Sequence, residues 1–240
     1  MTVELSLIGT FGLTSAGERL AVPESAQRLI AFLALQARPL SRALVASTLW
    51  LESSEERSSA NLRSALWRLR RPGHPLVVSS GKQLQLSPEV VVDAHALASR
   101  ARRLLDGAPR DADIGLDDDL LSGELLPDWY DDWVLIERER LRQLRIHALE
   151  ALADRLRAGR RFGHAVEAAL AAVRAEPLRE SAHRVLISVY LDEGNDCEAI
   201  RQFRFYRDYV NDELGVEPSQ LMVELVAGLP LDAPHDATRR

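Results

Sequence analysis

The amino-acid sequence predicts a mainly α-helical fold with a small β component. Aromatic residues make up only 5% of the 240 residues, whereas alanine, leucine and arginine are frequent, and this composition favours helices over a β-sandwich. Residues 3–11 alternate apolar and polar side chains, the pattern of a half-buried strand. From Asp93 onward the pattern is almost wholly helical. We therefore expect a mixed N-terminal part and an all-α remainder.

The first 93 residues contain segments typical of strands, then three helices, then a hairpin. Ser41 is predicted to cap the second helix, Ser53 or Ser54 the third, and Pro72-Gly73 ends the third helix. The predicted segments are strands at 3–11 and 20–22, helices at 26–37, 42–50 and 55–71, and hairpin strands at 76–79 and 84–86 around Gly81-Lys82. This order is that of a winged helix, a helix-turn-helix core followed by a β-ribbon.

The second half is predicted to contain helical repeats. We expect helices at 94–105 and 134–158, on either side of a broken acidic loop at 107–123. Small and apolar positions recur after 34 residues: Ala148, Leu152, Leu156, Ala165 and Ala169 correspond to Ala182, Leu186, Tyr190, Ala199 and Phe203. This period is typical of tetratricopeptide repeats. We therefore expect a winged-helix domain at 1–93, an all-α tetratricopeptide-like domain at 94–232 and a disordered tail at 233–240.

Charge is distributed unevenly along the chain. The formal net charge is −6, yet residues 1–93 carry a net charge of +2 and the remainder −8. Residues 57–82 hold six arginines and lysines and no acidic residue. A confined basic segment in an acidic chain indicates an anion-binding surface.

The third predicted helix has the pattern of a DNA-reading helix. Leu62, Leu66 and Leu69 are expected on one buried stripe, flanked by Ser59 and Ala65. Arginine can bind guanine, asparagine suits adenine, and serine and arginine contact phosphates. The predicted DNA-binding residues are Arg57, Asn61, Arg63, Ser64, Trp67, Arg68, Arg70 and Arg71 on this helix, and Lys82 in the wing at 76–86.

Several stretches resemble a known family. They are Leu7–Gly12, Arg28–Leu35, Leu49-Trp50, Asn61–Arg71, Gly123–Trp129, Asp132-Trp133 and Asp212–Pro218. In this order they resemble the Streptomyces antibiotic regulatory proteins, transcriptional activators that join an OmpR-type winged helix to a bacterial transcriptional activator domain. Trp67 departs from the pattern, because relatives usually carry a small polar residue or a base there.

The resemblance implies a DNA-binding transcriptional regulator. Its partners would be double-stranded promoter DNA, RNA polymerase through its sigma factor or alpha subunit, and a second protomer on tandem repeats. It implies no cofactor and no membrane. The helical half would support dimers and contact the transcription machinery, and the third helix would enter the major groove. The alternative is a protein-interaction scaffold in which the repeats bind a partner and the winged helix does not read DNA.

An enzyme is the third class considered. Seven aspartates and glutamates between Asp117 and Asp132 could bind a divalent cation, but their spacing matches no calcium loop, and capping aspartates in a solvated loop are expected instead. The six histidines lack metal-ligand spacing, and no phosphate loop or nucleophile motif occurs. We expect no catalytic residue, metal or cofactor. The single cysteine and the absence of a signal-like start predict a cytoplasmic protein.

Overall fold

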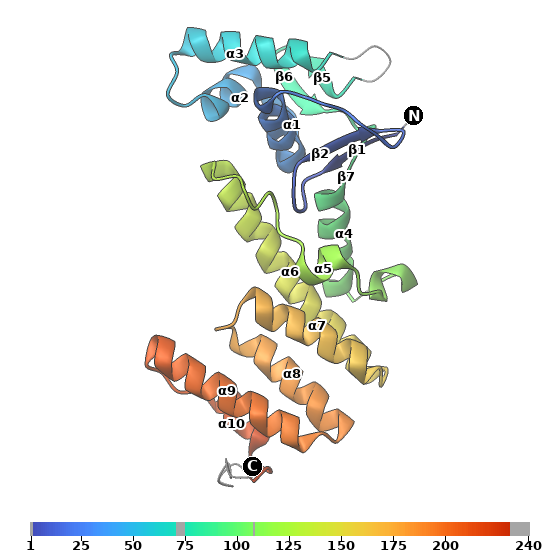
Figure 1. Cartoon of the computed structure of the whole chain (residues 1–240), viewed down its shortest axis with the longest axis vertical. Helices are drawn as coiled ribbons and strands as arrows, with labels where there is room; N and C mark the ends of the chain where they lie inside the picture. Colours follow the sequence, from blue (N-terminus) through green and yellow to red (C-terminus); the bar gives the residue numbers. More distant parts are fainter. Residues whose placement is uncertain (1, 71–74, 108, 231–240) are drawn as a thin grey trace, which may run out of the picture. The chain divides into compact units, whose positions relative to one another are not determined.

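The computed structural model describes residues 2–70, 75–107 and 109–230, and it confirms a mainly helical chain with a small β component (Figure 1). The chain divides into two compact units. The N-terminal unit comprises Met1–Ala98 and Gly123–Leu141, and the C-terminal unit comprises Ser99–Ser122 and Arg142–Arg240. The domain boundary expected at residue 93 stays a prediction, and the expected tail at 233–240 lies outside the described residues.

The N-terminal unit contains a four-stranded sheet in the order β3-β2-β1-β7. Its strands are β1 (Val3–Ser6), β2 (Gly12–Ser15), β3 (Glu18–Arg19) and β7 (Val90–Val92). β1 pairs antiparallel with β2 and parallel with β7. The strand expected at 3–11 is present but shorter, because β1 ends at Ser6. The strand expected at 20–22 was wrong: the chain returns earlier, as β2 and β3.

The side chain of Asp93 explains why β1 ends early. Its carboxylate accepts hydrogen bonds from the backbone N–H of Leu7 (2.8 Å) and of Ile8 (3.0 Å). The carboxylate thus satisfies two backbone N–H groups directly after the pairing with β2 ends at Ser6. Gly9 follows with φ +78°, a conformation that glycine adopts without strain, and it turns the chain toward β2.

Three helices and a small second sheet complete the N-terminal unit. The helices are α1 (Glu24–Gln36), α2 (Arg42–Leu49) and α3 (Glu55–Arg68). The Ser41 hydroxyl caps α2 by accepting from Leu44 N–H, and Ser54 caps α3 by accepting from Arg57 N–H, as predicted. The second sheet has the order β4-β6-β5, with β4 (Leu40–Ser41), β5 (Val77–Ser80) and β6 (Gln83–Leu86). Strands β5 and β6 are the predicted hairpin.

Residues 123–141 pack back on the N-terminal unit. Ile8 forms a bridge with Leu125, and Gly9 N–H donates to the carbonyl of Glu124 at 2.7 Å. The ring of Trp129 stacks on Phe11 with a centroid distance of 5.9 Å, and Trp133 meets Phe32 edge-on at 5.2 Å. Two of the stretches that carry the family resemblance, at 7–12 and 123–129, are therefore in contact.

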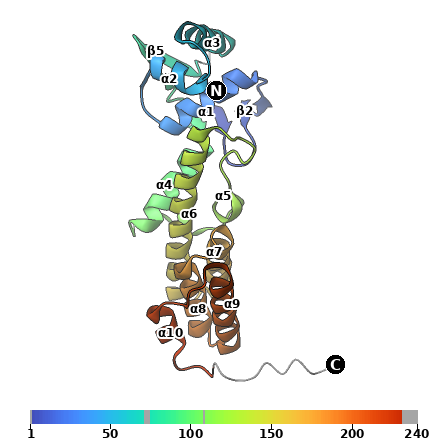
Figure 2. The same ribbon diagram turned by 90° about the vertical axis from the view of Figure 1, so that its left-hand side faces the viewer.

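The C-terminal unit is a stack of antiparallel helices (Figures 1 and 2). It takes its first helical segments from α4 (Asp93–Leu105) and α6 (Asp132–Ala158), which both units share. The 3-10 helix η1 (Asp111–Ile114) and α5 (Asp118–Ser122) occupy the expected acidic loop. The repeats continue through α7 (Phe162–Ala175), α8 (Glu180–Glu193), α9 (Asp196–Leu214) and α10 (Gln220–Val226).

The 34-residue period is visible in the packing of these helices. Nine of the ten recurring positions are buried, and the tenth, Tyr190, is half-buried. Small alanines such as Ala169 and Ala199 let neighbouring helices approach closely. α10 closes the stack by placing Met222 and Val226 against α8 and α9. The tetratricopeptide-like arrangement is confirmed.

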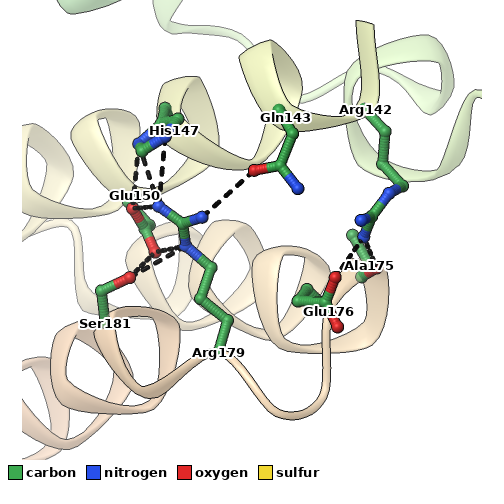
Figure 3. Close-up of polar contacts among 8 residues, drawn as sticks. All are labelled: Arg142, Gln143, His147, Glu150, Ala175, Glu176, Arg179 and Ser181. Atoms are coloured by element: carbon green, nitrogen blue, oxygen red, sulfur yellow. Dashed lines mark hydrogen bonds and ion pairs between the residues drawn. The ribbon is translucent and has the colours of Figure 1, made fainter. Parts of the chain in front are cut away.

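Polar contacts join α6 to α7 and to the start of α8 (Figure 3). The guanidinium of Arg179, from the turn before α8, points toward α6, where its Nε lies 2.8 Å from Oε1 of Glu150. The same carboxylate oxygen accepts from the Ser181 hydroxyl at 2.6 Å. Nearby, Arg142 donates to the carbonyl of Ala175 and to Glu176. Each cation in this cluster is thus satisfied within the unit.

Asp113 gives the C-terminal unit a testable pH dependence. Arg103 donates two hydrogen bonds to its carboxylate at 2.6 and 2.8 Å, and Arg110 N–H donates a third. The Arg103 guanidinium holds the pKa of Asp113 far below its ordinary value. A lowered folded-state pKa stabilises the fold above the unfolded-state pKa of about 4 and loses that effect as pH falls toward the folded-state pKa.

We therefore predict that Asp113→Asn reduces the loss of stability between pH 7 and pH 3. The measurement is urea-induced unfolding at both pH values, followed by circular dichroism. Asp212→Asn is the control, because Asp212 is exposed on α9 and forms no ion pair with any described residue. An unchanged pH dependence in Asp113→Asn contradicts the assignment.

Candidate nucleic-acid interface

Helix α3 is anchored by a narrow stripe of small and apolar side chains. Ser58, Leu62, Ala65 and Leu69 are each no more than 3% exposed. The predicted stripe of Leu62, Leu66 and Leu69 was partly wrong, because Leu66 is only half-buried. The small side chains at 58 and 65 allow close packing on α1 and α2, and the Ser58 hydroxyl is satisfied by the Glu55 carbonyl at 3.0 Å.

The remaining circumference of α3 is available to solvent. The exposed residues among the predicted site residues are Arg57, Arg63, Ser64, Trp67 and Arg68 on α3, Arg70 two residues beyond the end of this helix, and Lys82 in the hairpin. Asn61 is half-buried at one border of the helix. Arg68 lies at this border too and donates to the Ser25 hydroxyl of α1 at 3.4 Å. Arg71 lies outside the described residues, so its predicted role is untested.

The other border of α3 faces the β5–β6 hairpin across two hollows. The larger, of about 830 Å³, lies between α3 and β5, and Arg42, Arg63, Arg70 and Ser79 contribute polar groups to its wall. The smaller, of about 420 Å³, is lined by Arg42, Arg63 and Lys82. Four cations therefore line the border between α3 and the hairpin: Arg42, Arg63, Arg70 and Lys82. Two of them, Arg42 and Arg63, line both hollows.

Arg42 was not among the residues predicted from the sequence. It is the first residue of α2, and its backbone N–H donates to the Lys82 carbonyl at 2.9 Å. Its guanidinium donates to the Ser79 hydroxyl at 2.8 Å. The sequence signal was a basic residue directly after the Ser41 cap. Its place beside the hairpin depends on the pairing of β4 with β6, which the sequence did not reveal.

The basic side chains on this surface carry no neutralising partner among the described residues. Arg42, Arg63, Arg70 and Lys82 form no ion pair there, and neither do Arg57 and Arg68. In the C-terminal unit, by contrast, arginines such as Arg103, Arg142 and Arg179 are matched with carboxylates. The acids of α3, Glu55 and Glu56, stand in its first turn, where they favour the helix N-terminus. The unpaired positive charge is suited to an external anion.

The acidic stretch 117–132 has structural roles. Asp117 pairs with Arg100 and accepts from Leu120 N–H at the start of α5, as a capping aspartate does. Asp131 pairs with Arg28 of α1. Within the described residues, no group of three or more histidine, cysteine or acidic side chains is placed to hold a metal ion. None of the described helices has the length and apolar content that crossing a membrane requires.

Comparison with known proteins identifies the family. The family model named bacterial transcriptional activator domain matches residues 91–229 of the chain. The chain belongs to this family. The match covers α4 and the helical repeats, and the resemblance to the Streptomyces antibiotic regulatory proteins is thereby confirmed.

One relative and one solved structure extend the likeness beyond the activator domain. The regulatory protein AfsR of Streptomyces coelicolor is 29% identical over 221 residues, which are 87% of this chain and 22% of AfsR. The structure of Mycobacterium tuberculosis EmbR, in complex with a low-affinity phosphopeptide, matches with a TM-score of 0.77 at 20% identity. That match covers 96% of this chain and 66% of the EmbR chain, and it shows a shared fold. The chain thus spans less than two thirds of the length of either protein.

Because Leu62 belongs to the buried stripe of α3 and Leu66 does not, replacing each by alanine should lower the free energy of unfolding by different amounts. Leu62→Ala should lower the free energy of unfolding by about 2–5 kcal/mol, because it removes a buried side chain from a close-packed site. Leu66→Ala should cost clearly less, since that side chain is already half in contact with solvent. Urea unfolding of both variants provides the comparison. Equal costs would support the originally predicted stripe instead.

Proposed function

We propose that the protein binds double-stranded promoter DNA in a sequence-specific manner, with α3 in the major groove and the β5–β6 hairpin on the sugar–phosphate backbone. The observation that carries this proposal is the set of unpaired cations that α3, α2 and the hairpin hold around one border. A polyanion satisfies all of them together. In this arrangement the outer face of α3 reads the base sequence, and the borders of the helix position the protein on the DNA backbone.

Helix α3 has suitable dimensions and chemistry for the major groove. Its 14 residues span about 21 Å, and the groove of B-DNA is about 12 Å wide. On its outer face Arg57 and Ser64 are free to meet base edges, and Asn61 lies at the border. Arginine and asparagine form the bidentate contacts that distinguish guanine and adenine.

The two borders of α3 are assigned to phosphates. Arg63 and Arg70 point toward the hairpin, where Arg42 and Lys82 complete the wall of the hollows. A DNA strand at the edge of the major groove would run along this wall. Arg68, on the side of α3 that faces α1, would contact phosphates of the opposite strand. Arg71 is assigned the same kind of contact from its position in the sequence alone. Such contacts fix register and carry no sequence information by themselves.

The helical repeats are assigned to protein contacts. Tetratricopeptide-like stacks present extended surfaces and seldom catalyse reactions. We infer that they recruit RNA polymerase, through its sigma factor or alpha subunit, and support a second protomer on DNA. One reading helix covers too few base pairs to select a site in a genome, so two protomers on tandem half-sites are required.

A protein-interaction scaffold is the second candidate. Glu55 and Glu56 in the first turn of α3 favour it, because carboxylates there repel phosphates. EmbR, which shares the fold, is described in complex with a phosphopeptide. The two candidates differ in one property. A protein that makes several phosphate contacts binds duplex DNA with an affinity that falls steeply as the salt concentration rises. A protein-interaction scaffold is not expected to show this dependence.

Salt dependence of DNA affinity therefore tests the proposal. The full chain should bind calf-thymus DNA with a logarithmic slope that steepens by about 0.9 for each phosphate contacted. Arg63→Ala should weaken binding to all duplexes alike and flatten the slope by about one. Arg19→Ala is the matched control, because this exposed arginine lies on β3, in the sheet that does not contain the β5–β6 hairpin. A wild-type slope near zero would favour the scaffold.

Tandem binding gives an independent prediction. Half-sites should be spaced by about one helical turn of roughly 10 base pairs. Inserting about half a turn between them should abolish cooperative binding, whereas a full turn should partly preserve it, because two protomers then again lie on one face of the duplex. Gel-shift titration of the three duplexes measures this. Cooperativity that ignores the insertion, or a single protomer on the whole site, contradicts the tandem arrangement.

A further inference from the structure

Trp67 is an unusual residue for the middle of a polar surface. It lies on the outer face of α3, and 71% of its surface is exposed. Its neighbours on that face are Ser64 and, toward the hairpin, Arg63 and Arg70. Among the described residues no aromatic ring stacks on the indole, and no guanidinium lies over it. The helix is anchored without it, through the stripe that contains Leu62 and Ala65.

The surroundings of Trp67 favour a nucleic-acid partner over a protein one. The indole stands at the rim of the larger hollow, whose apolar wall includes Leu66 and Val77. Unpaired cations flank it on the same wall. An apolar protein surface would have to bury those cations without partners, which is costly. A duplex satisfies the cations while the ring contacts the groove floor.

The major groove offers this ring one kind of apolar partner. The edges of guanine, cytosine and adenine present hydrogen-bond donors and acceptors, whereas thymine adds a C5-methyl group. Burying an exposed indole against donors and acceptors leaves those groups without water, while burying it against a methyl group removes apolar surface from water on both sides. The favourable contact is therefore with the methyl group.

We propose that Trp67 recognises the C5-methyl group of a pyrimidine, so that each protomer prefers thymine at one position of its half-site. This inference rests on the proposed function and specifies one contact of the same surface. 5-Methylcytosine carries its methyl group at the same ring position and is accepted there better than cytosine. Trp67 is thus a specificity-determining residue, distinct from the arginines that contribute affinity for any sequence.

The test removes only the C5-methyl group of thymine and leaves the rest of the base unchanged. A bound sequence is first selected from a random duplex pool with the full chain. Each thymine of the selected site is then replaced singly by deoxyuridine, which lacks only the C5-methyl group, and affinity is measured by fluorescence anisotropy at fixed salt. The wild type should lose about fourfold in affinity at one position per half-site, the value expected for one buried methyl group. Trp67→Ala should bind the thymine and deoxyuridine duplexes equally there.

A control variant separates this contact from a general aromatic effect. Tyr130→Ala removes an aromatic side chain that is 78% exposed in the same unit but lies outside α3 and the hairpin. It should retain the fourfold discrimination. The inference is overturned if no single deoxyuridine weakens the wild type, if the loss persists in Trp67→Ala, or if the selected half-sites contain no thymine. Absence of any duplex binding overturns the proposed function itself.

Discussion

Helix α3 packs on α1 and α2 through Ser58, Leu62, Ala65 and Leu69, and this narrow contact is the constraint on which the rest of the surface depends. Two of the four residues are small, so the helix sits close to its supports and uses less than half of its circumference to do so. Most other positions on α3 are thereby left exposed, while Ser59, Asn61 and Leu66 at its borders are half-buried. The same packing sets the rotation of the helix, and it turns Arg63 and Arg70 toward the hairpin.

The pairing of charges differs between the C-terminal unit and the surface formed by α3 and the hairpin. In the C-terminal unit, carboxylates neutralise arginines such as Arg103 and Arg179, and the pairs hold helices together. On α3 and the hairpin the cations remain unpaired among the described residues, so they repel one another and contribute little to the stability of the fold. Their arrangement around a common border is explained by an anionic partner. Within this border Trp67 adds an apolar surface that can distinguish one base from another.

Much of the architecture could be predicted from the sequence because its signals are local. Helix periodicity, the caps Ser41 and Ser54, and the 34-residue repeat all depend on residues close in the chain. What escaped prediction depends on distant partners. β7 pairs in parallel with β1, and Asp93, the residue after β7, accepts from the backbone at the end of β1. Arg42 reaches the hairpin only because β4 pairs with β6. The rotation of α3 differed because Ser58 is buried, and a polar residue gives no apolar signal in the sequence.

Contact between α3 and DNA is tested most directly by photo-cross-linking. A benzophenone amino acid is placed at Ser64, which is exposed on the outer face of α3, and in a second variant at Glu167, which is exposed on α7. Each variant is irradiated with a selected duplex at saturating concentration, and covalent protein–DNA adducts are quantified by mass spectrometry. Adducts on bases are expected from position 64 and none from position 167. Adducts from position 167 alone would contradict it, because they would place the DNA on the helical repeats.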